Sequence, residues 1–240
     1  MCKVGIFNQN VQSIKSKVQR LEIILTKLDN DIVLITEHWE NTDQLTTIPI
    51  QGYNLGASFC RLQNKHGGVA IYTKSGLDSR EANCARKASV CNVFECCGVE
   101  LKKSNIVVLC VYRPPSNKIE ETTLFLRKME ELLQYFLDNG KRVIIGGNFN
   151  TDFRVKSALC NAFHNVVNSY NMYITTTEPT RVTCFWSTRL DNIVVNNSSI
   201  LLDKTEVLDT HLSDHFALYT NVHLNISDKE CDYVTARTIS

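Results

Sequence analysis

The chain has 240 residues, of which 43% are hydrophobic, and its 26 Lys and Arg against 25 Asp and Glu leave a net charge of +1. A chain of this size can bury a sizeable core, and we expect one globular domain over residues 1–226, followed by a polar tail over residues 227–240. The small net charge excludes a global field that attracts nucleic acid or a membrane, so any site for a polyanion must be local.

The cysteines and the first residues bear on where the protein works. The ten cysteines form no C-x-x-C pair with a second such pair or a His-x-x-x-His partner, so zinc binding is not predicted. Residues 1–15 alternate polar and apolar side chains, unlike a secretion signal, and no run approaches the roughly 20 apolar residues of a membrane span. We therefore expect reduced cysteines, no membrane partner, and a nuclear or cytoplasmic protein.

The N-terminal half of the sequence predicts mostly strands. Residues 3–11 alternate as a strand, apolar residues recur at helical spacing over residues 18–28, and residues 31–39 return to a strand. This is a strand, helix, strand unit. Three more strands with turn residues between them are predicted at Gly67–Lys74, Val90–Leu101 and Asn105–Tyr112.

The C-terminal half adds two helices and three strands. An amphipathic helix is predicted at Leu124–Phe136, a buried strand at Val143–Gly147 and a third helix at Lys156–Tyr170. Two late strands follow at Leu190–Asn196 and His215–Leu224. Helices among at least eight strands, several of them joined by short antiparallel links, predict an α/β fold of two mixed sheets packed together with helices outside.

Polar side chains follow the predicted strands at the points where the strands end. They are Asn10, Glu37, Tyr112, Arg113, Asn148, Asn150, Asp191, Asp214 and His215. If these ends meet at one edge, the carboxylates could hold a hard cation, Mg²⁺ or Mn²⁺, and the other groups could donate to phosphate oxygens. Taken alone, Glu37 is equally a solvated loop acid, Tyr112 a core tyrosine and His215 a structural histidine. The prediction therefore depends on the order and setting of these residues.

Six short motifs occur in an order that is typical of one superfamily. They are "NQNVQS", "ITEHW", "VYRPP", "GGNFN", "STRLDNIVV" and "LSDHFAL". This succession resembles the endonuclease/exonuclease/phosphatase superfamily, which includes apurinic/apyrimidinic endonucleases and DNase I. It is most similar to the endonuclease domains of non-LTR retrotransposons, for which "YRPP", "EPTRVT" and "LDNIVVN" are typical. The resemblance covers about Val4 to Leu224 and implies a DNase I-like four-layer sandwich, an Mg²⁺-dependent phosphodiesterase, DNA as the partner and a monomer.

The resemblance also implies a role for each matching polar residue. Glu37 would be the main metal ligand, with Asn10 beside it. Tyr112 and Asn150 would contact the scissile phosphate or stabilise the transition state. Asp191 would support the site from the strand that it begins.

The remaining implied roles concern the histidine and the substrate. Asp214 would orient His215, and His215 would hydrogen-bond a phosphate oxygen, so that developing charge meets both metal and imidazole. Arg113 would bind the substrate backbone. Ser213 and Thr183 match positions that line the DNA side of the site.

One departure from the family pattern lies in "GGNFN". The family has aspartate where this chain has Asn148, and that carboxylate orients or deprotonates the attacking water. Asparagine has nearly the same shape but no basicity, and removing a general base costs on the order of 10² to 10⁴ in rate. Asp152, two residues past Asn150, would substitute only if its loop brought it within hydrogen-bond reach of that water.

Three functions stay open at this point. The leading hypothesis is an Mg²⁺-dependent endonuclease of the retrotransposon type that nicks DNA, with catalysis weakened or abolished at Asn148. The rival is a catalytically dead module that binds nucleic acid or a protein. A phosphatase for small phosphorylated lipids or nucleotides belongs to the same superfamily, but "YRPP" and "LDNIVVN" make it the weakest of the three.

Context and surface loops complete the expectations. The chain is interpreted either as a domain excised from a polyprotein that also holds a reverse transcriptase, or as a solitary remnant. Loops at Gln63–His66 and Thr175–Trp186 are expected to set any DNA preference. The basic residues Arg80, Arg86 and Lys87 could touch backbone phosphates, although a solvated surface is the favoured interpretation.

Overall fold

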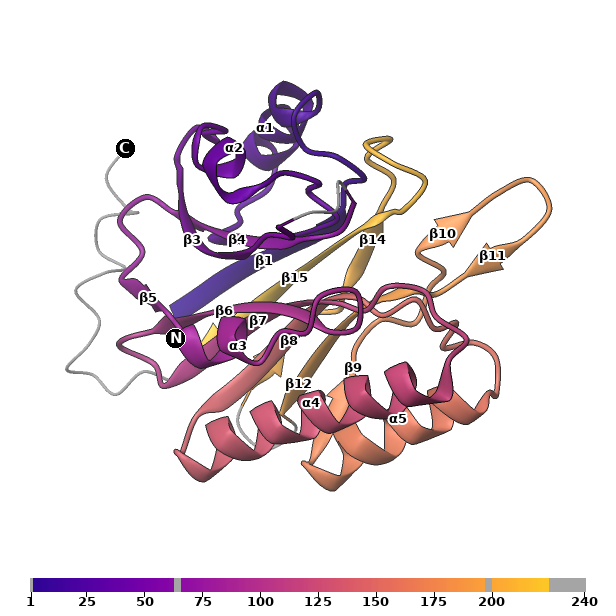
Figure 1. The fold of residues 1–240 in the computed structure, drawn as a ribbon. Helices are drawn as coiled ribbons and strands as arrows, with labels where there is room; N and C mark the ends of the chain where they lie inside the picture. The colour runs from indigo at the N-terminus through magenta and orange to yellow at the C-terminus, as the bar shows by residue number, and fades with distance from the viewer. Residues whose placement is uncertain (1, 63–65, 197–199, 225–240) are drawn as a thin grey trace.

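Two β-sheets packed face to face form the centre of the molecule (Figure 1), and a computed structural model describes residues 2–62, 66–196 and 200–224. The strand order is β13-β15-β1-β2-β4-β3 in the first sheet, with β14 also paired to β15, and β5-β6-β7-β8-β12-β9 in the second. Strands β10 and β11 form a separate two-stranded hairpin.

The bounds of the elements are as follows. The first sheet contains β1 (Cys2–Asn10), β2 (Ile32–Thr36), β3 (Tyr53–Phe59), β4 (Val69–Lys74), β13 (Leu201–Leu202), β14 (Glu206–Leu208) and β15 (Ala217–Leu224). The second contains β5 (Ser79–Glu81), β6 (Glu95–Leu101), β7 (Ile106–Tyr112), β8 (Arg142–Asn148), β9 (Met172–Ile174) and β12 (Asp191–Asn196). The hairpin is β10 (Arg181–Val182) and β11 (Ser187–Thr188). The helices are α1 (Val18–Thr26), α2 (Thr42–Thr46), α3 (Asn83–Lys87), α4 (Ile119–Asp138) and α5 (Ala158–Ser169).

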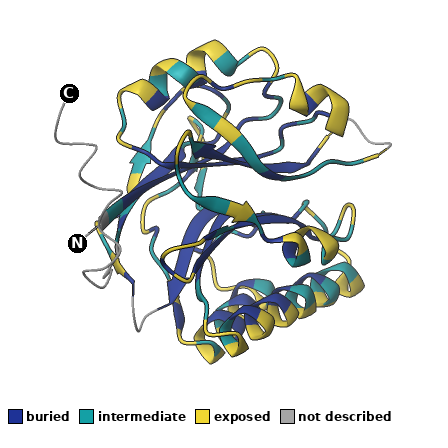
Figure 2. Ribbon diagram, turned by 90° about the vertical axis from the view of Figure 1, so that its left-hand side faces the viewer, coloured by how far each residue is buried: buried dark blue, intermediate teal, exposed yellow. Residues whose placement is uncertain are grey.

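Both sheets are mixed, and helices cover their outer faces (Figures 1 and 2). The pairs β1–β2 and β7–β8 are parallel, and each is joined through a helix, α1 and α4 respectively. Buried side chains of α1 and α2 pack on the first sheet, and those of α4 and α5 pack on the second. The predicted four-layer sandwich of two mixed sheets flanked by helices is confirmed.

Alternating side chains along the strands fill the layers. On β1, Ile6 lies in the apolar cluster between the sheets and Phe7 in the cluster under α1. On β12, Ile193 lies between the sheets and Val194 under α4 and α5. Central strands such as β7 are therefore continuous apolar runs, because both of their faces are buried.

The three predicted helices and eight predicted strands are all present. The strand predicted at Val90–Leu101 begins only at Glu95, because Val90 and Phe94 close a turn through hydrogen bonds in both directions. Strand β3 was not predicted, because a bulge between Leu55 and Ala57 breaks its alternation of side chains.

Several expectations fall on residues outside the described ranges. The polar tail at 227–240 lies there, as do residues 63–65 of the first predicted DNA loop. The eight cysteines whose state the structure gives are all free thiols. Within the described ranges, no helix has the length and apolar character needed to cross a bilayer.

The strand register brings the ends of neighbouring strands to one edge of each sheet. Asn10 at the end of β1 lies opposite Thr36 at the end of the parallel strand β2. Tyr112 at the end of β7 lies opposite Asn148 at the end of β8, and Asn148 in turn lies opposite Asp191 at the start of β12. This edge holds the candidate site.

Candidate functional site

Asn148, Asp191 and His215 form a buried polar cluster, which we call the histidine corner. His215 Nδ1 lies 2.7 Å from Asp191 Oδ2, and the Asn148 side-chain nitrogen donates to Asp191 Oδ1 over 2.8 Å. Thr180 adds a hydroxyl donor to Asp191 Oδ2 at 2.9 Å. All three side chains of the corner are at most 4% exposed, so this is a dry hydrogen-bonded unit.

The charge of His215 depends on this unit. Burial by itself lowers the pKa of His215, but the negative charge and hydrogen bond of Asp191, together with the charge of Asp214, raise that pKa above its ordinary value. Nδ1–H therefore donates to Asp191. The imidazolium form leaves Nε2–H as a donor that Asp191 does not use.

The prediction that Asp214 orients His215 is wrong, because Asp191 does so. Asp214 Oδ1 is 3.9 Å from His215 Nε2, which is beyond hydrogen-bond range. Its side chain is 39% exposed and instead accepts from Gln12 Nε2 at 2.8 Å and Arg181 Nε at 2.7 Å. Sequence adjacency misled the prediction, since the partner that reaches the ring comes from β12 in the opposite sheet.

Asn148 is fitted to the histidine corner as an amide. Its Nδ2 points to Asp191 and lies 3.3 Å from His215 Nδ1, while its Oδ1 has no hydrogen-bond partner among the described residues. A carboxylate in the same place would put two like charges in a buried site, which raises the pKa of one of them. The buried Oδ1 is an acceptor that is left for a ligand or a water.

Asn10, Glu37 and Tyr112 form a second cluster, which we call the glutamate corner. Glu37 Oε1 accepts from Asn10 Nδ2 at 2.8 Å, and Oε2 accepts from the Trp39 indole at 3.2 Å. Burial and then the negative charge of Glu37 raise the pKa of the Tyr112 hydroxyl, so it stays protonated. Glu37 is only half-buried, in contrast to the histidine corner.

The backbone of the glutamate corner is strained. Glu37 and Trp39 have φ values of +56° and +64°, in the left-handed region that side chains other than glycine rarely adopt. Two backbone hydrogen bonds hold them there, from Glu37 N to Gly68 O and from Trp39 N to Gly67 O. Strain of this kind clusters at functional sites, because the surrounding structure must enforce it.

The donor set of the glutamate corner fits a weakly held hard cation. Among the described residues, no group of three or more His, Cys, Asp or Glu side chains could hold a metal. Glu37 supplies one carboxylate, and beside it lies the amide oxygen of Asn10, which also accepts from the Gln12 N–H at 3.3 Å. Mg²⁺ keeps most of its waters and takes one or two carboxylates, so this pair suits Mg²⁺ and does not suit zinc.

Hydrogen bonds between the end of β1 and the segment before β15, which are neighbours in the first sheet, link the two corners. The carbonyl of Asn10 accepts from Ser213 Oγ at 2.6 Å and from Gln9 Nε2 at 3.0 Å. Gln9 Nε2 also donates to the carbonyl of His215 at 2.8 Å. The structure therefore brings Glu37 and His215 into one site, as the strand-end pattern predicted. The contribution of Gln9 was missed, because an amide side chain inside a strand gives no functional signal.

Arg113 does not face the substrate, contrary to prediction. Its side chain is buried, and its guanidinium donates to the carbonyls of Phe149, Asn150 and Ser116 and lies over the ring of Phe125. It holds the loops after β7 and β8 together. These hydrogen bonds satisfy three loop carbonyls that would otherwise be buried without partners.

Asn150 is held by the same loop. Its Nδ2 donates to the carbonyl of Arg113 at 2.8 Å, and its φ of +47° is again left-handed. One amide hydrogen is left for a ligand. Asp152 is not a substitute base in this structure, because its Oδ1 accepts from the backbone N–H groups of Arg154 and Arg189.

The hydroxyls of Ser213 and Thr183 are engaged within the protein. Ser213 donates to Asn10 and accepts from the His215 backbone N–H at 3.1 Å. Thr183 Oγ1 closes the turn between β10 and β11 by accepting from the N–H groups of Phe185 and Trp186. Their first role is to hold the loops, and the prediction that they line the DNA side is untested.

The turn of this hairpin exposes aromatic side chains that the sequence analysis did not single out. Phe185 is 91% exposed and Trp186 is 45% exposed. The hairpin projects from the molecule beside the start of β15 (Figure 1). The pair "FW" in a short polar stretch was the available signal.

A second missed feature lies behind Tyr112. Arg61 Nε donates to the fully buried Glu95 at 2.6 Å, and the guanidinium lies 6.0 Å from the Tyr112 ring centroid. Glu95 also accepts from the backbone N–H of Gly68, whose carbonyl holds Glu37. This ion pair therefore supports the glutamate corner from beneath.

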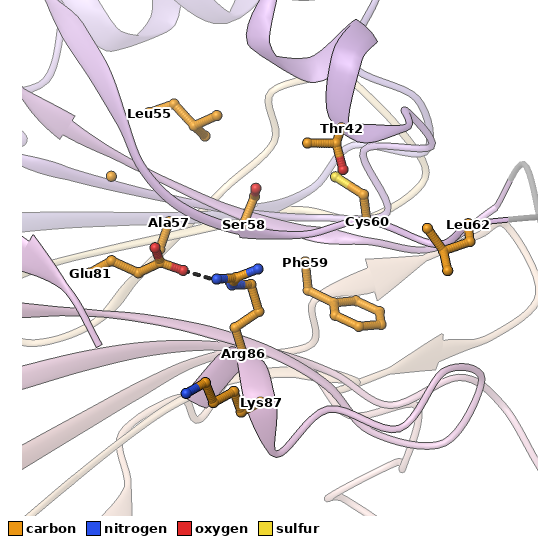
Figure 3. A pocket seen from close by; sticks show the side chains of 11 residues that line it. Thr42, Leu55, Ala57, Ser58, Phe59, Cys60, Leu62, Glu81, Arg86 and Lys87 are labelled. Atoms are coloured by element: carbon orange, nitrogen blue, oxygen red, sulfur yellow. Dashed lines mark hydrogen bonds and ion pairs between the residues drawn. The ribbon is translucent and has the colours of Figure 1, made fainter. Parts of the chain in front are cut away.

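The basic residues Arg80, Arg86 and Lys87 lie away from both corners. A groove of about 660 Å³ runs along β3 and α3, and Arg86 in its wall is paired with Glu81 (Figure 3). Arg80 is paired with Glu100. Two of the three charges are thus neutralised, which favours a solvated surface.

Comparisons with known proteins show which family has this fold. A sequence model described as the endonuclease/exonuclease/phosphatase family matches residues 8–215. No curated protein matches the chain.

Solved structures match over nearly the whole fold. The endonuclease domain of TRAS1, a telomere-specific non-LTR retrotransposon, is 19% identical with a TM-score of 0.73, covering 93% of this chain and 99% of that chain. The Xenopus laevis APE2 catalytic domain is 19% identical with a TM-score of 0.66, covering 94% of each chain. An Asp-to-Asn variant of NExo, a Neisseria 3′ phosphatase bound to a product DNA hairpin, is 16% identical with a TM-score of 0.69, covering 92% and 99%. At these identities the likeness shows the fold.

Proposed function

The chain belongs to the endonuclease/exonuclease/phosphatase family, and from this premise we propose that it is a metal-dependent DNA phosphodiesterase whose catalysis is weakened at Asn148. The observation that carries the proposal is the setting of Asn148. It is fully buried between Asp191 and the site histidine, and its free Oδ1 is the acceptor of the histidine corner that no described residue uses.

Three residues at the strand ends would supply donors to a phosphate. Asp191 raises the pKa of His215 above its ordinary value, which favours the imidazolium form that offers Nε2–H. The Tyr112 hydroxyl stays protonated, and Asn150 keeps one amide hydrogen. Donors that are already oriented stabilise charge as it develops on a pentacoordinate phosphorus, at no cost in reorganisation.

Glu37 is the residue that would hold the metal. Its two oxygens are oriented by Asn10 and Trp39 and are half-exposed, so a hydrated cation can approach. A bound Mg²⁺ would supply Lewis-acid polarisation of the phosphoryl oxygens. Asn10 then acts by fixing the carboxylate.

Proton removal is the step that this chain lacks. Asn148 Oδ1 can accept a hydrogen bond from a water and so orient it, but an amide cannot take its proton. The loss of a positioned base predicts a rate about 10² to 10⁴ below that of a site with a carboxylate. Binding and transition-state contacts would be retained.

The aromatic hairpin is the proposed contact for DNA outside the phosphate site. Phe185 and Trp186 are exposed at its turn, and Arg154 contacts the hairpin through a hydrogen bond to Ser187. Aromatic rings stack on bases of any sequence, and arginines meet backbone phosphates. DNA binding is therefore expected to be salt-sensitive and nearly blind to sequence.

A nicking assay on supercoiled plasmid with Mg²⁺ tests the proposal. Asn148→Asp is expected to raise the nicking rate about 10²-fold or more, the lower end of what a positioned base contributes. Combining Asn148→Asp with His215→Ala should lose most of that gain, because residues that act as a unit are not additive. Equal rates for the native chain and Asn148→Asp, both well above background, would show that position 148 is not the base.

A binding module is the second candidate, and the completeness of the histidine corner favours it. Asn148 donates to Asp191 in a neutral arrangement that suits retention of phosphate without cleavage. This candidate expects salt-sensitive DNA binding by the native chain and no nicking by Asn148→Asp. A binding measurement beside the nicking assay separates the two functions.

A further inference from the structure

The β10–β11 hairpin is joined directly to the segment that carries His215. Arg181, the first residue of β10, forms an isolated backbone bridge with His215, and the Phe216 N–H donates to the carbonyl of Thr180 at 2.6 Å. Thr180 also donates its hydroxyl to Asp191. The base of the hairpin and the histidine corner are thus one connected piece of structure.

The hairpin cannot hold its own orientation. Only two residue pairs are in register, Arg181 with Thr188 and Val182 with Ser187. Even longer isolated hairpins are only marginally stable in water. Contacts with the rest of the protein must therefore fix the direction in which its aromatic turn points.

The Arg181 side chain makes such a contact. Its Nε donates to Asp214 Oδ2 at 2.7 Å, a second guanidinium nitrogen contacts the same oxygen, and the guanidinium carbon lies 5.1 Å from the Trp186 ring centroid. The other oxygen of Asp214 accepts from Gln12. One cation therefore connects the indole of the hairpin turn to a carboxylate beside His215.

We propose that Arg181 is a positioning residue that fixes the β10–β11 hairpin to the histidine corner, so that DNA engagement at Trp186 is transmitted to Asp214 and His215. The part that concerns DNA rests on the proposed function, whereas the tie within the protein does not. Three charged groups face His215: Asp191 from β12, the adjacent Asp214, and Arg181 from β10. A DNA phosphate near the hairpin would compete with Asp214 for Arg181 and change this balance.

Tryptophan fluorescence tests the tie without DNA or activity. The chain has two tryptophans, so Trp39→Phe leaves Trp186 as the only one. In that background, Arg181→Ala and Asp214→Asn should each lower the anisotropy of Trp186 and raise its quenching by acrylamide at least about twofold, as loss of an arginine–indole stack predicts. Arg80→Ala is the matched control, since it breaks a surface pair with Glu100 on the second sheet.

A second substitution at position 181 separates a local effect on Trp186 from a failure to fold. Arg181→Lys keeps the charge but loses the planar fork, so it should fall between the native residue and alanine. Thermal melting of each variant reports whether it folds, and the lysine variant decides the result if alanine does not fold. Unchanged Trp186 anisotropy and quenching in folded Arg181→Ala or Arg181→Lys would overturn the proposal.

The proposal also predicts the direction in which each variant shifts the pKa of His215, and a general loosening of the site would not give the same two directions. In NMR titrations, with the His215 signal assigned by His215→Gln, Arg181→Ala should raise the pKa of His215 because a nearby positive charge is lost. Asp214→Asn should lower it. General opening of the site would instead move both variants towards the ordinary histidine value. Shifts in the same direction would therefore contradict the proposal.

A short DNA duplex at low salt tests transmission. Adding it should shift the His215 signal in the native chain and shift it at least about twofold less in Arg181→Ala. An equal shift in both proteins would overturn transmission through Arg181. If the duplex binds neither protein, the proposed DNA-binding function fails, and so does the transmission from Trp186 to His215. The fluorescence result alone then decides whether Arg181 fixes the hairpin to Asp214.

Discussion

The histidine corner and the glutamate corner lie at one edge of the sandwich but are built in opposite ways. Asn148, Asp191 and His215 are almost completely buried and bond to one another. Glu37 is half-exposed on a left-handed backbone, and its carboxylate is steered by single hydrogen bonds from neighbours. The first corner has its geometry fixed by the protein, whereas the second leaves room for water and a ligand.

Because of this difference, substitutions in the two corners are expected to change different properties of the protein. A change of charge in the dry corner cannot be screened by water, so it must alter stability or a pKa. A change in the open corner can be solvated, so it should alter ligand binding and leave the fold intact. Asn148 lies in the dry corner, so a carboxylate introduced at this position is expected to affect the fold as well as the chemistry.

The largest expected effect is on stability, in the histidine corner. Asp191→Ala should lower the free energy of unfolding by about 3 to 5 kcal/mol, because it leaves a buried imidazolium without its partner. Urea denaturation at pH 6 measures this change. Asp214→Ala is the matched control: its carboxylate is 39% exposed, and such pairs contribute about 1 kcal/mol or less. Similar losses for both variants would show that the two carboxylates are not differently buried in solution.

The next effect concerns position 148 without metal. Asn148→Asp should cost about 1 to 3 kcal/mol of stability at pH 7, because its new charge faces the buried Asp191. Added Mg²⁺ should recover part of this loss if the cation approaches both corners. Thermal melting with and without Mg²⁺ gives the answer. Asn150→Asp, at a half-exposed position, should show a smaller loss, and an equal or larger one would contradict this account.

Much of the fold was predictable, because long strands and helices carry strong periodic signals. The apolar run of β8 was found within one residue of its observed bounds, and the apolar face of α4 was found although the helix begins five residues earlier, at Ile119. The hairpin was not, since strands of two residues have no periodicity. Its position depends on contacts of Thr180 and Arg181 with Asp214 and Phe216, which are distant in sequence.

The site was predictable as a set of residues and only partly as a set of contacts. Strand-end position brought Glu37 and His215 together, because neighbouring strands end at a common edge. The partner of His215 was misassigned, since Asp214 is adjacent in sequence and Asp191 is adjacent in space. Arg113 was misassigned because a strand-end arginine gives the same sequence signal whether it faces a phosphate or buried carbonyls.

A smaller effect is expected in the glutamate corner, and it should concern metal and not stability. Glu37→Ala should weaken Mg²⁺ binding at least about tenfold, since the corner has one carboxylate and its removal leaves only amide and hydroxyl oxygens. Calorimetry measures the affinity. Asp43→Ala is the control, because it removes the same negative charge from an exposed position on α2. Unchanged Mg²⁺ affinity in Glu37→Ala would move the metal away from this corner.

The smallest effect is a pH dependence that only the dry corner should show. Asp191 holds the pKa of His215 above its ordinary value, so the folded state binds a proton that the unfolded state has begun to lose. The resulting stability is fully present below the unfolded pKa of about 6.5 and is lost as the pH rises through the higher folded value. Unfolding free energies measured from pH 6 to 8 should therefore fall, and those of His215→Gln should fall less. His38, whose pKa burial lowers to about 4, acts with the opposite sign: its contribution is lost as the pH falls, so it cannot produce this decline. Parallel curves for the native chain and His215→Gln would mean that His215 gains no proton affinity from the fold, and the contrast between the two corners would then rest on geometry alone.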